Sequence, residues 1–366
     1  MIDIGRTIVT VVLFFGILGA LVVIHELGHF VVAKLFRIRV LEFGIGFPPR
    51  ARVLRNKGET VYTLNWLPIG GFVKLEGEDG DAAGDPRSFS AQRLSKQLLV
   101  LVAGVLMNVA LAAAIFTGIA LVGDPAIGAV VGTVEPGSPA DMVGVRAGDV
   151  LERVNGKAEG AFGPGSVLAD LRANAGKTVR LTLRRDGQVI ELTATLRTTA
   201  EVNATKPPRG ALGITAAEGR ITPDRINYPL GTALQVGVDR TTSAMALIVD
   251  GVGQLATAIV TKPTEAPPAS GPIGIATQIG DVFWTLGPIV TLYLAGILSA
   301  NLAVVNILPF PPLDGGRMLM LVIKRFAGRR FSLRAERLTY FVGFAMLLAF
   351  LVWVTGFDIA RGLSGG

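Results

Sequence analysis

The chain has 366 residues, of which 50% are hydrophobic, and its formal net charge is +7. Its mean hydropathy of +0.53 is too high for an ordinary soluble enzyme and indicates a protein with membrane spans. The chain contains no cysteine, which excludes disulfides, thiolate metal sites and a cysteine nucleophile. We expect no nucleic-acid partner, because the basic residues gather in loops beside apolar segments, where they set membrane orientation.

Four segments are long and apolar enough to cross a bilayer, at residues 8–32, 98–122, 283–308 and 338–354. The first lacks the positively charged start and the small-residue cleavage site of a signal peptide, so we expect it to be retained. The sequence therefore predicts an α-helical integral membrane protein with about four transmembrane helices.

Two loops carry clusters of basic residues, at residues 34–57 and 324–337. Positively charged loops next to spans face the cytoplasm, so both loops are predicted to be cytoplasmic. The N-terminus and the long segment between the second and third spans then lie outside. We expect a multi-pass protein of the plasma or inner membrane, with that long segment on the extracytoplasmic side.

Residues 33–95 form a polar loop punctuated by glycine. Short strands are predicted at residues 61–64 and 72–75, around a turn at PIGG, residues 68–71. An acidic connection follows at residues 76–85. This loop is expected to form a small β element beside the membrane.

Residues 127–218 alternate short β-rich runs with Gly, Pro and Asn turns, which is typical of a small inserted β-rich domain. The run GSPADMVGVRAGDVLERVNGK, residues 137–157, resembles the core of a PDZ domain. RGALGI, residues 209–214, resembles the PDZ loop that receives a peptide carboxylate, here in circularly permuted order. The alternative is a structural β domain without a ligand. In the PDZ interpretation the loop residues that bind peptide C-termini are Gly210, Leu212, Gly213 and Ile214.

Residues 229–262 have the pattern of a moderately amphipathic helix, which is expected to lie at the membrane surface. A Pro- and Ala-rich linker follows at residues 262–272. The predicted organisation is an N-terminal membrane part, a PDZ domain, an amphipathic and linker region, and a C-terminal membrane part, at residues 1–126, 127–218, 219–282 and 283–366.

The run LVVIHELGHFV contains the only two histidines of the chain, His25 and His29. Positions i and i+4 share one face of a helix, so both imidazoles can bind one metal ion. Glu26 can act as a general base toward water, as in the HExxH zinc peptidases. Ionisable residues inside an apolar span are functional by default. The alternative is a pair of packed or snorkelling histidines near the interface.

Catalytic zinc usually takes three protein ligands and a water. Since cysteine and a third histidine are absent, the third ligand must be an aspartate or a glutamate. The best candidate is Asp314 in NILPFPPLDGG, residues 306–316, which follows the third span. Spans one and three run in the same direction, so the three side chains are expected at one depth toward the cytoplasm. The alternative for Asp314 is a capping residue in a turn.

HELGHF in the first span and NILPFPPLDGG after the third resemble the site-2 protease family of intramembrane zinc metalloproteases. LPIGGFVKL, AGVLMN with Asn108, and SGPIGIA at residues 270–276 add to the likeness, and the inserted PDZ core points to the bacterial regulator-of-sigma-E protease branch. The resemblance implies one Zn²⁺ per chain, held by His25, His29 and Asp314, with Glu26 activating the attacking water.

The resemblance also implies how substrate is held. Asn301 and Asn306 match family asparagines that bind substrate or stabilise the reacting carbonyl. A transmembrane helix must unwind before attack, and an exposed strand edge can hold the unwound segment. The matching β element comprises Gly70, Gly71, Phe72, Val73 and Lys74.

The expected substrates are single-span membrane proteins cleaved within the lipid bilayer by regulated intramembrane proteolysis. Membrane-bound anti-sigma factors and remnant signal peptides are both candidate substrates, and the resemblance does not decide between them. Two other classes of protein compete with the enzyme. A zinc permease would need polar residues along several spans, and the second and fourth spans supply almost none. A membrane scaffold built around the PDZ domain would not need Glu26.

Overall fold

The computed structural model describes residues 4–56, 58–78, 85–161, 165–204, 209–262, 264–327 and 333–364. Lys57, Arg329, Arg330 and most of the predicted acidic connection lie outside the described residues. The chain divides into two compact units, Met1–Ile115 with Thr241–Gly366, and Phe116–Arg240. Each unit has its own elements and core.

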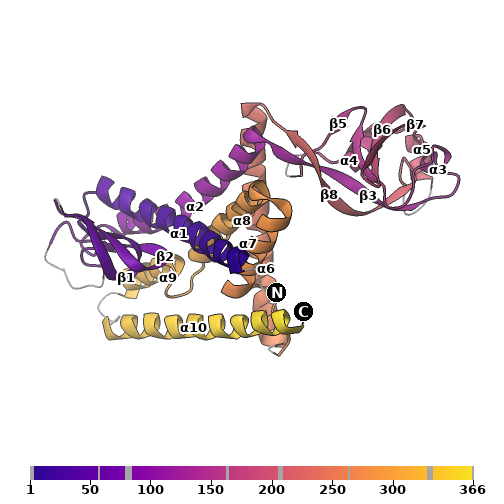
Figure 1. Ribbon diagram of the computed structural model, residues 1–366. Coiled ribbons are helices and arrows are strands. Elements are labelled where there is room, and N and C mark those ends of the chain that lie inside the picture. Colours follow the sequence, from indigo (N-terminus) through magenta and orange to yellow (C-terminus); the bar gives the residue numbers. More distant parts are fainter. Residues whose placement is uncertain are drawn as a thin grey trace. The chain divides into compact units, whose positions relative to one another are not determined.

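Helices dominate the first unit (Figure 1). Two helices, α2 (Leu94–Val122) and α6 (Leu230–Thr261), begin in one unit and end in the other. The helices lying wholly within the first unit are α1 (Ile4–Leu35), α7 (Pro272–Leu286), α8 (Pro288–Ile307), α9 (Asp314–Ala327) and α10 (Leu333–Ser364).

Among the described residues, five helices are long and apolar enough to cross a membrane: α1, α2, α6, α8 and most of α10. These helices confirm a multi-pass membrane protein. They do not confirm the count of four, because α6, expected at the membrane surface, also has the length and composition of a span.

The apolar segment predicted as one span at residues 283–308 is two helices. Gly287 has a φ of 85°, which ends α7, and Pro288 is the first residue of α8. Glycine adopts positive φ without strain, and proline is favoured at the first helical position because its missing N–H would be unpaired there. The break leaves α8 as a separate 20-residue helix.

The β element consists of β1 (Val40–Arg55) and β2 (Val61–Leu75), beside α1 in Figure 1. The prediction of a turn at residues 68–71 is wrong, because β2 runs through it and bends at Gly70, whose φ is +78°. In the register, Ile45 pairs with both Leu64 and Gly71, so the first half of β1 lies between the two halves of β2. Among the described residues, the end of β2 is therefore a sheet edge.

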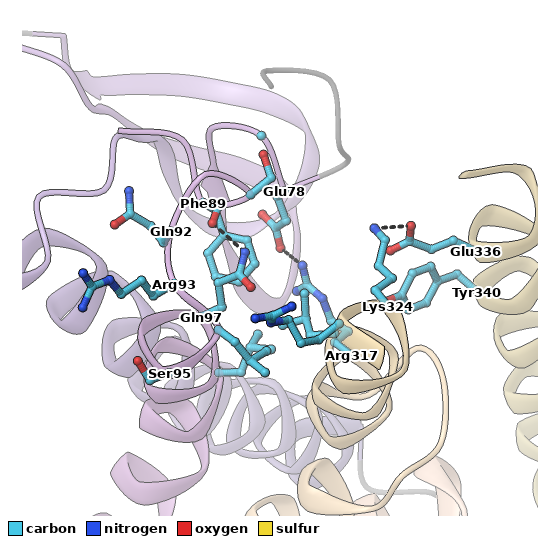
Figure 2. Close-up of a pocket in the computed structure, with 16 residues that line it drawn as sticks. Glu78, Phe89, Gln92, Arg93, Ser95, Gln97, Arg317, Lys324, Glu336 and Tyr340 are labelled. Carbon is cyan, nitrogen blue, oxygen red and sulfur yellow. Dashed lines mark hydrogen bonds and ion pairs between the residues drawn. The ribbon is translucent and has the colours of Figure 1, made fainter. Parts of the chain in front are cut away.

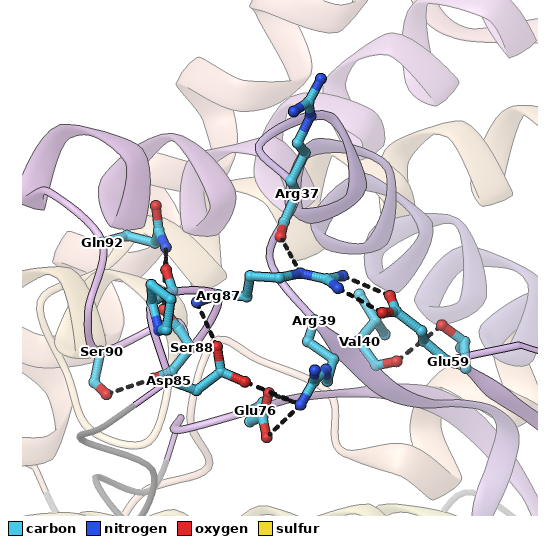
Figure 3. A network of polar contacts seen from close by, with 12 residues as sticks. Arg37, Arg39, Val40, Glu59, Glu76, Asp85, Arg87, Ser88, Ser90 and Gln92 are labelled. Carbon is cyan, nitrogen blue, oxygen red and sulfur yellow. Dashed lines mark hydrogen bonds and ion pairs between the residues drawn. The ribbon is translucent and has the colours of Figure 1, made fainter.

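Polar contacts fix the base of this β element (Figure 3). The Arg87 guanidinium donates to both carboxylate oxygens of Glu59 at 2.5 Å and to the Arg37 carbonyl at 3.2 Å. These hydrogen bonds hold the pKa of Glu59 below its usual range. Arg39 pairs with Glu76 at 3.1 Å just beyond β2. The connection into α2 is thereby tied to the ends of both strands.

The second unit contains a six-stranded sheet in the order β7-β6-β4-β3-β8, with β5 beside β4. Its core includes Leu151, Leu181 and Leu183, all fully buried. The strands are β3 (Asp124–Val134), β4 (Val150–Val154), β5 (Lys157–Ala158), β6 (Thr178–Arg185), β7 (Gln188–Thr195) and β8 (Ile214–Ile226). The short helices are α3 (Pro139–Met142), α4 (Val167–Ala173) and α5 (Thr199–Asn203).

The outer strand β8 extends beyond residue 218, where the β-rich domain was expected to end. Val134 pairs with Ile214 at one end of β3, and Asp124 pairs with Ile226 at the other. A long antiparallel ladder pairs the backbone polar groups with which the two strands face each other, so the sheet continues to residue 226.

Candidate functional site

Two histidines of α1 and the first residue of α9 meet in the first unit. His25 Nε2 lies 2.9 Å from Asp314 Oδ2, and His29 Nε2 lies 3.3 Å from the same oxygen. The two imidazole Nε2 atoms are 3.2 Å apart. All three residues are buried, with 5 to 8% of their surfaces exposed. Residues 289 positions apart in the chain thus form one polar cluster where the apolar helix α1 meets the start of α9.

Local sequence explains why Asp314 reaches this place. Prolines at positions 309, 311 and 312 end α8 and separate it from α9. A Cβ on Gly315 would overlap the Ile307 and Leu308 carbonyl oxygens, so only glycine lets the first turn of α9 fold back onto the end of α8. A carboxylate at a helix N-terminus is also favoured by the helix dipole. Asp314 therefore does stand in a first helical turn, and its carboxylate points at the histidines.

Three residues of α2 line the other side of the imidazoles. The His29 Nδ1 lies 2.8 Å from the Val100 carbonyl oxygen. A carbonyl only accepts, so Nδ1 carries a proton, and in the neutral ring that binds a metal Nε2 then presents a lone pair. The Asn108 Nδ2 lies 3.3 Å from His25 Nδ1. A Cβ on Gly104 would lie 2.5 Å from His29 Nε2, so glycine is required where α2 passes the cluster.

The cluster fits a metal ion. In a tetrahedral site with metal–ligand distances of about 2 Å, neighbouring ligand atoms lie about 3.3 Å apart. The three measured separations, 2.9, 3.2 and 3.3 Å, are close to that spacing. The His29 lone pair and the Asp314 carboxylate also point at one position, where a cation would satisfy both. Among the described residues this is the one group of three with such geometry.

Glu26 is next to the cluster but is not part of it. Its Oε2 accepts a hydrogen bond from the Val73 backbone N–H at 3.1 Å. The side chain is half-buried, between the histidines of α1 and the edge of β2. The geometry thus places the Glu26 carboxylate beside both the His25–His29–Asp314 cluster and the strand edge.

The glycines of the β element pack on α1. A Cβ on Gly70 would lie 2.8 Å from Val22 Cγ1, and a Cβ on Gly71 would lie 3.2 Å from Val23 Cγ2. The close approach that these glycines permit is therefore to the helix that carries the histidines. Among the described residues, neither Asn301 nor Asn306 has a side-chain hydrogen-bond partner, and both are only partly exposed on α8. Their amides are available to a ligand.

An ion pair joins α9 to the β element. Arg317, one turn after Asp314, pairs with Glu78, whose other oxygen accepts the Leu75 N–H at 3.1 Å. Figure 2 shows this pair and the Lys324–Glu336 pair at a pocket of about 620 Å³ between α2, α9 and α10. The pair links the element that carries Asp314 to the end of the strand that contacts Glu26.

The predicted carboxylate loop lies in the second unit. The Leu212 side chain is 1% exposed and belongs to the core. The Gly213 N–H donates to the Gly210 carbonyl at 3.1 Å, and Gly213 has a φ of +82°. Ile214 is the first residue of β8. The loop therefore lies directly before an outer strand.

The contact of α2 with the histidines was not predicted from the sequence, where AGVLMN with Asn108 contributed only to the family resemblance. Val100, Gly104 and Asn108 are spaced by four and so lie on one helix face toward the histidines. The signal was present in VAGVLMN, where a glycine and an asparagine lie one turn apart in an apolar run. It resembles ordinary helix packing, because small residues also allow close helix contacts.

Two histidines and an adjacent glutamate on a helix apolar enough to cross a membrane, together with an aspartate at the start of α9, define a membrane-embedded metallopeptidase. The model of peptidase family M50 matches residues 13–350, and the chain belongs to this family, the site-2 proteases. The expectation drawn from HELGHF and NILPFPPLDGG is thereby confirmed.

Curated relatives align along almost the whole chain. A protein of Clostridium perfringens, provisionally named a zinc metalloprotease, is 33% identical over 352 residues, covering 93% of this chain and 96% of the relative. A similarly named protein of Clostridium acetobutylicum is 30% identical over 341 residues, covering 93% of this chain and 94% of the relative. Zinc metalloprotease RasP of Geobacillus kaustophilus is 28% identical over 435 residues, covering 97% and 99%. The similarity is therefore not confined to the motifs.

Proposed function

We propose that the protein is a zinc endopeptidase that cleaves transmembrane segments of single-span membrane proteins within the bilayer. The observation that carries this proposal is the meeting of His25 and His29, on the apolar helix α1 beside Glu26, with Asp314 at the start of α9. One zinc ion per chain is supported by the ligand spacing and by the names of the relatives. Anti-sigma factors and remnant signal peptides are the two candidate substrate classes.

The chain's residues would divide the chemistry as follows. His25, His29 and Asp314 would hold zinc, which when bound polarises the scissile carbonyl and lowers the pKa of water. Glu26 would take the proton of the attacking water and deliver it to the leaving nitrogen. Asn301 and Asn306, whose amides have no partners among the described residues, would bind the substrate backbone on α8.

This function is tested by comparing membrane proteomes of cells that carry the wild-type enzyme or Glu26→Gln. Short single-span proteins should accumulate only with the variant, because loss of the base stops their removal. A proteome in which no single-span protein differs between the two strains would contradict the proposed substrate class.

The edge of β2 is proposed to hold unwound substrate. Residues 71–75 pair with β1 on one side only, and the Val73 N–H points toward Glu26. A substrate strand added to this edge would lie beside the His25–His29–Asp314 cluster. A substrate helix has its carbonyls bonded internally and must be held open before attack.

Val73→Pro should lower cleavage of a single-span substrate by about tenfold or more. Proline removes the Val73 N–H, which donates to the Glu26 carboxylate at this edge, and losing one hydrogen bond to a charged group has an effect of this size. Zinc content should stay normal, because Val73 lies outside the ligand cluster. Val73→Thr keeps the N–H and the β-branched shape and serves as the matched control. Wild-type cleavage by a zinc-loaded Val73→Pro protein would show that substrate is not held at this edge.

The relative directions of α1, α2 and α8 support the proposed membrane topology. Val100 lies against His29 and Asn108 against His25, so α1 and α2 are antiparallel. The Arg6 guanidinium lies 5.3 Å from the Trp284 ring just before α8, while Asp314 after α8 meets the histidines. We infer that α8 runs with α1, so an even number of crossings separates α2 from α8. This favours α6 at the membrane surface.

The absence of native cysteines allows a direct test of orientation. Gln188→Cys, at the start of β7, should react with a membrane-impermeant maleimide applied to intact cells. Ser90→Cys, before α2, should react only after the membrane is opened. Both side chains are exposed, so burial does not confuse the comparison. Labelling of Ser90→Cys in intact cells, with protection of Gln188→Cys, would invert the proposed orientation.

The second unit is proposed to act as a PDZ domain for peptide C-termini on the extracytoplasmic side. Its outer strand β8 follows the predicted carboxylate loop, and a pocket of about 310 Å³ lies between residues 216–219 of β8 and the start of α4. A strand edge facing a helix across a pocket is the arrangement that accepts an extended peptide.

A further inference from the structure

Asn108 contacts His25 at Nδ1, the ring nitrogen that does not face Asp314. Its side chain is 0% exposed, in the middle of α2. One amide atom, Nδ2, lies 3.3 Å from His25 Nδ1, while Oδ1 has no hydrogen-bond partner among the described residues. A buried amide oxygen without a donor is unfavourable and calls for a physical reason.

The two orientations of this amide have opposite consequences for His25. With Nδ2 toward the ring, Nδ1 accepts and Nε2 carries the proton that it donates to Asp314 at 2.9 Å. A half-turn of the amide puts Oδ1 toward the ring, where it can accept a proton from Nδ1. Nε2 then presents a lone pair to the position shared with His29 and Asp314, and Oδ1 takes over the contact with Nδ1 that Nδ2 gives up.

We propose that Asn108 is a positioning residue that fixes the metal-binding tautomer of His25 through its side-chain oxygen. This inference rests on the proposed function of the cluster as a zinc site. The Val100 carbonyl already does the same for His29, because it can only accept from Nδ1 at 2.8 Å. In this proposal each imidazole has one acceptor on α2: the Val100 backbone carbonyl for His29 and the Asn108 side-chain oxygen for His25. Such second partners orient a ligand ring and strengthen its bond to the metal.

The surroundings hold Asn108 in place for this role. The Ser299 hydroxyl of α8 donates to the Asn108 backbone carbonyl at 2.8 Å. Gly104, one turn earlier, brings α2 against both imidazoles. Neither contact uses the Asn108 side chain, so the amide is committed to His25 alone.

The test measures Zn²⁺ affinity of the purified full chain in detergent, by competition with a chromophoric chelator. Asn108→Leu has a similar volume and no acceptor, and should weaken zinc binding by about 10- to 100-fold. Asn108→Asp keeps an acceptor and should bind zinc at least as tightly as wild type. Gln97→Leu is the matched control, since it replaces another buried amide of α2, whose Nε2 donates to the Phe89 carbonyl at 2.8 Å away from the cluster, and it should leave affinity unchanged.

The contrast between the two Asn108 variants separates positioning from packing. Wild-type affinity in Asn108→Leu would overturn the proposal, and so would an Asn108→Asp protein that binds zinc as weakly as Asn108→Leu. Failure of the wild-type chain itself to bind zinc would instead overturn the proposed zinc site, and the Asn108 proposal with it.

Discussion

Asp314→Ala should remove most of the zinc from the purified protein and abolish cleavage. Its Oδ2 lies within 3.3 Å of both histidine Nε2 atoms, so the substitution deletes one of three proposed ligands. Two imidazoles alone leave a catalytic zinc site short of its usual protein ligands. Elemental analysis should find close to one zinc per wild-type chain and far less in the variant. His25→Ala should behave in the same way.

Asp358→Ala is a matched control for this loss. Asp358 is also a buried aspartate, 7% exposed against 8% for Asp314. Its carboxylate accepts the Gly271 and Gly274 N–H groups at the start of α7 and does not touch the cluster. This variant should keep its zinc. An Asp314→Ala protein that retains one zinc per chain and full activity would show that the ligand assignment is wrong.

Glu26→Gln should keep zinc and lower cleavage by about 10²- to 10⁴-fold, the usual contribution of a general base. Glu26 is outside the ligand cluster, so metal content should not depend on its charge. The glutamine oxygen can still accept the Val73 N–H, which preserves the contact with β2. Only the ability to take up a proton is lost.

The readout for this variant is the initial rate on a purified single-span substrate, with zinc per chain measured on the same sample. A zinc-loaded Glu26→Gln enzyme that cleaves within a factor of a few of wild type would exclude Glu26 as the base. Loss of zinc from the variant would instead place Glu26 among the groups that build the metal site.

The grouping of His25, His29 and Asp314 could be predicted from the sequence for two physical reasons. A spacing of four puts both imidazoles on one face of a helix, whatever else the chain does. The composition then leaves only carboxylates as a third ligand, and one aspartate follows an apolar segment between helix-breaking residues. Spacing, composition and the direction of the spans can all be read from the sequence, so no knowledge of the tertiary packing was needed.

The partners on α2 could not be predicted in this way. Val100 contributes a backbone carbonyl, which leaves no trace in its side chain. Gly104 and Asn108 have meaning only once α2 is known to pack on the histidines, a contact between distant parts of the chain. The same holds for Glu78 and Arg317, which meet across 239 positions.

Two local predictions failed, the first because tertiary pairing outweighs turn propensity and the second because hydropathy averages over a local break. PIGG reads as a turn, yet Ile45 of β1 pairs with both halves of β2 and holds the strand through the bend at Gly70. The third apolar segment reads as one span, yet Gly287 adopts a positive φ that separates α7 from α8. Hydropathy averages over such a break and does not register it.

The central claim is that the cluster beside Glu26 hydrolyses peptide bonds inside a membrane span. The most direct measurement is mass spectrometry of the products formed when the purified enzyme acts on a single-span protein in lipid vesicles. We expect wild-type enzyme to cut within the apolar segment and Glu26→Gln to produce no such cut. Cuts confined to the soluble parts of the substrate, or identical products from both enzymes, would contradict this account.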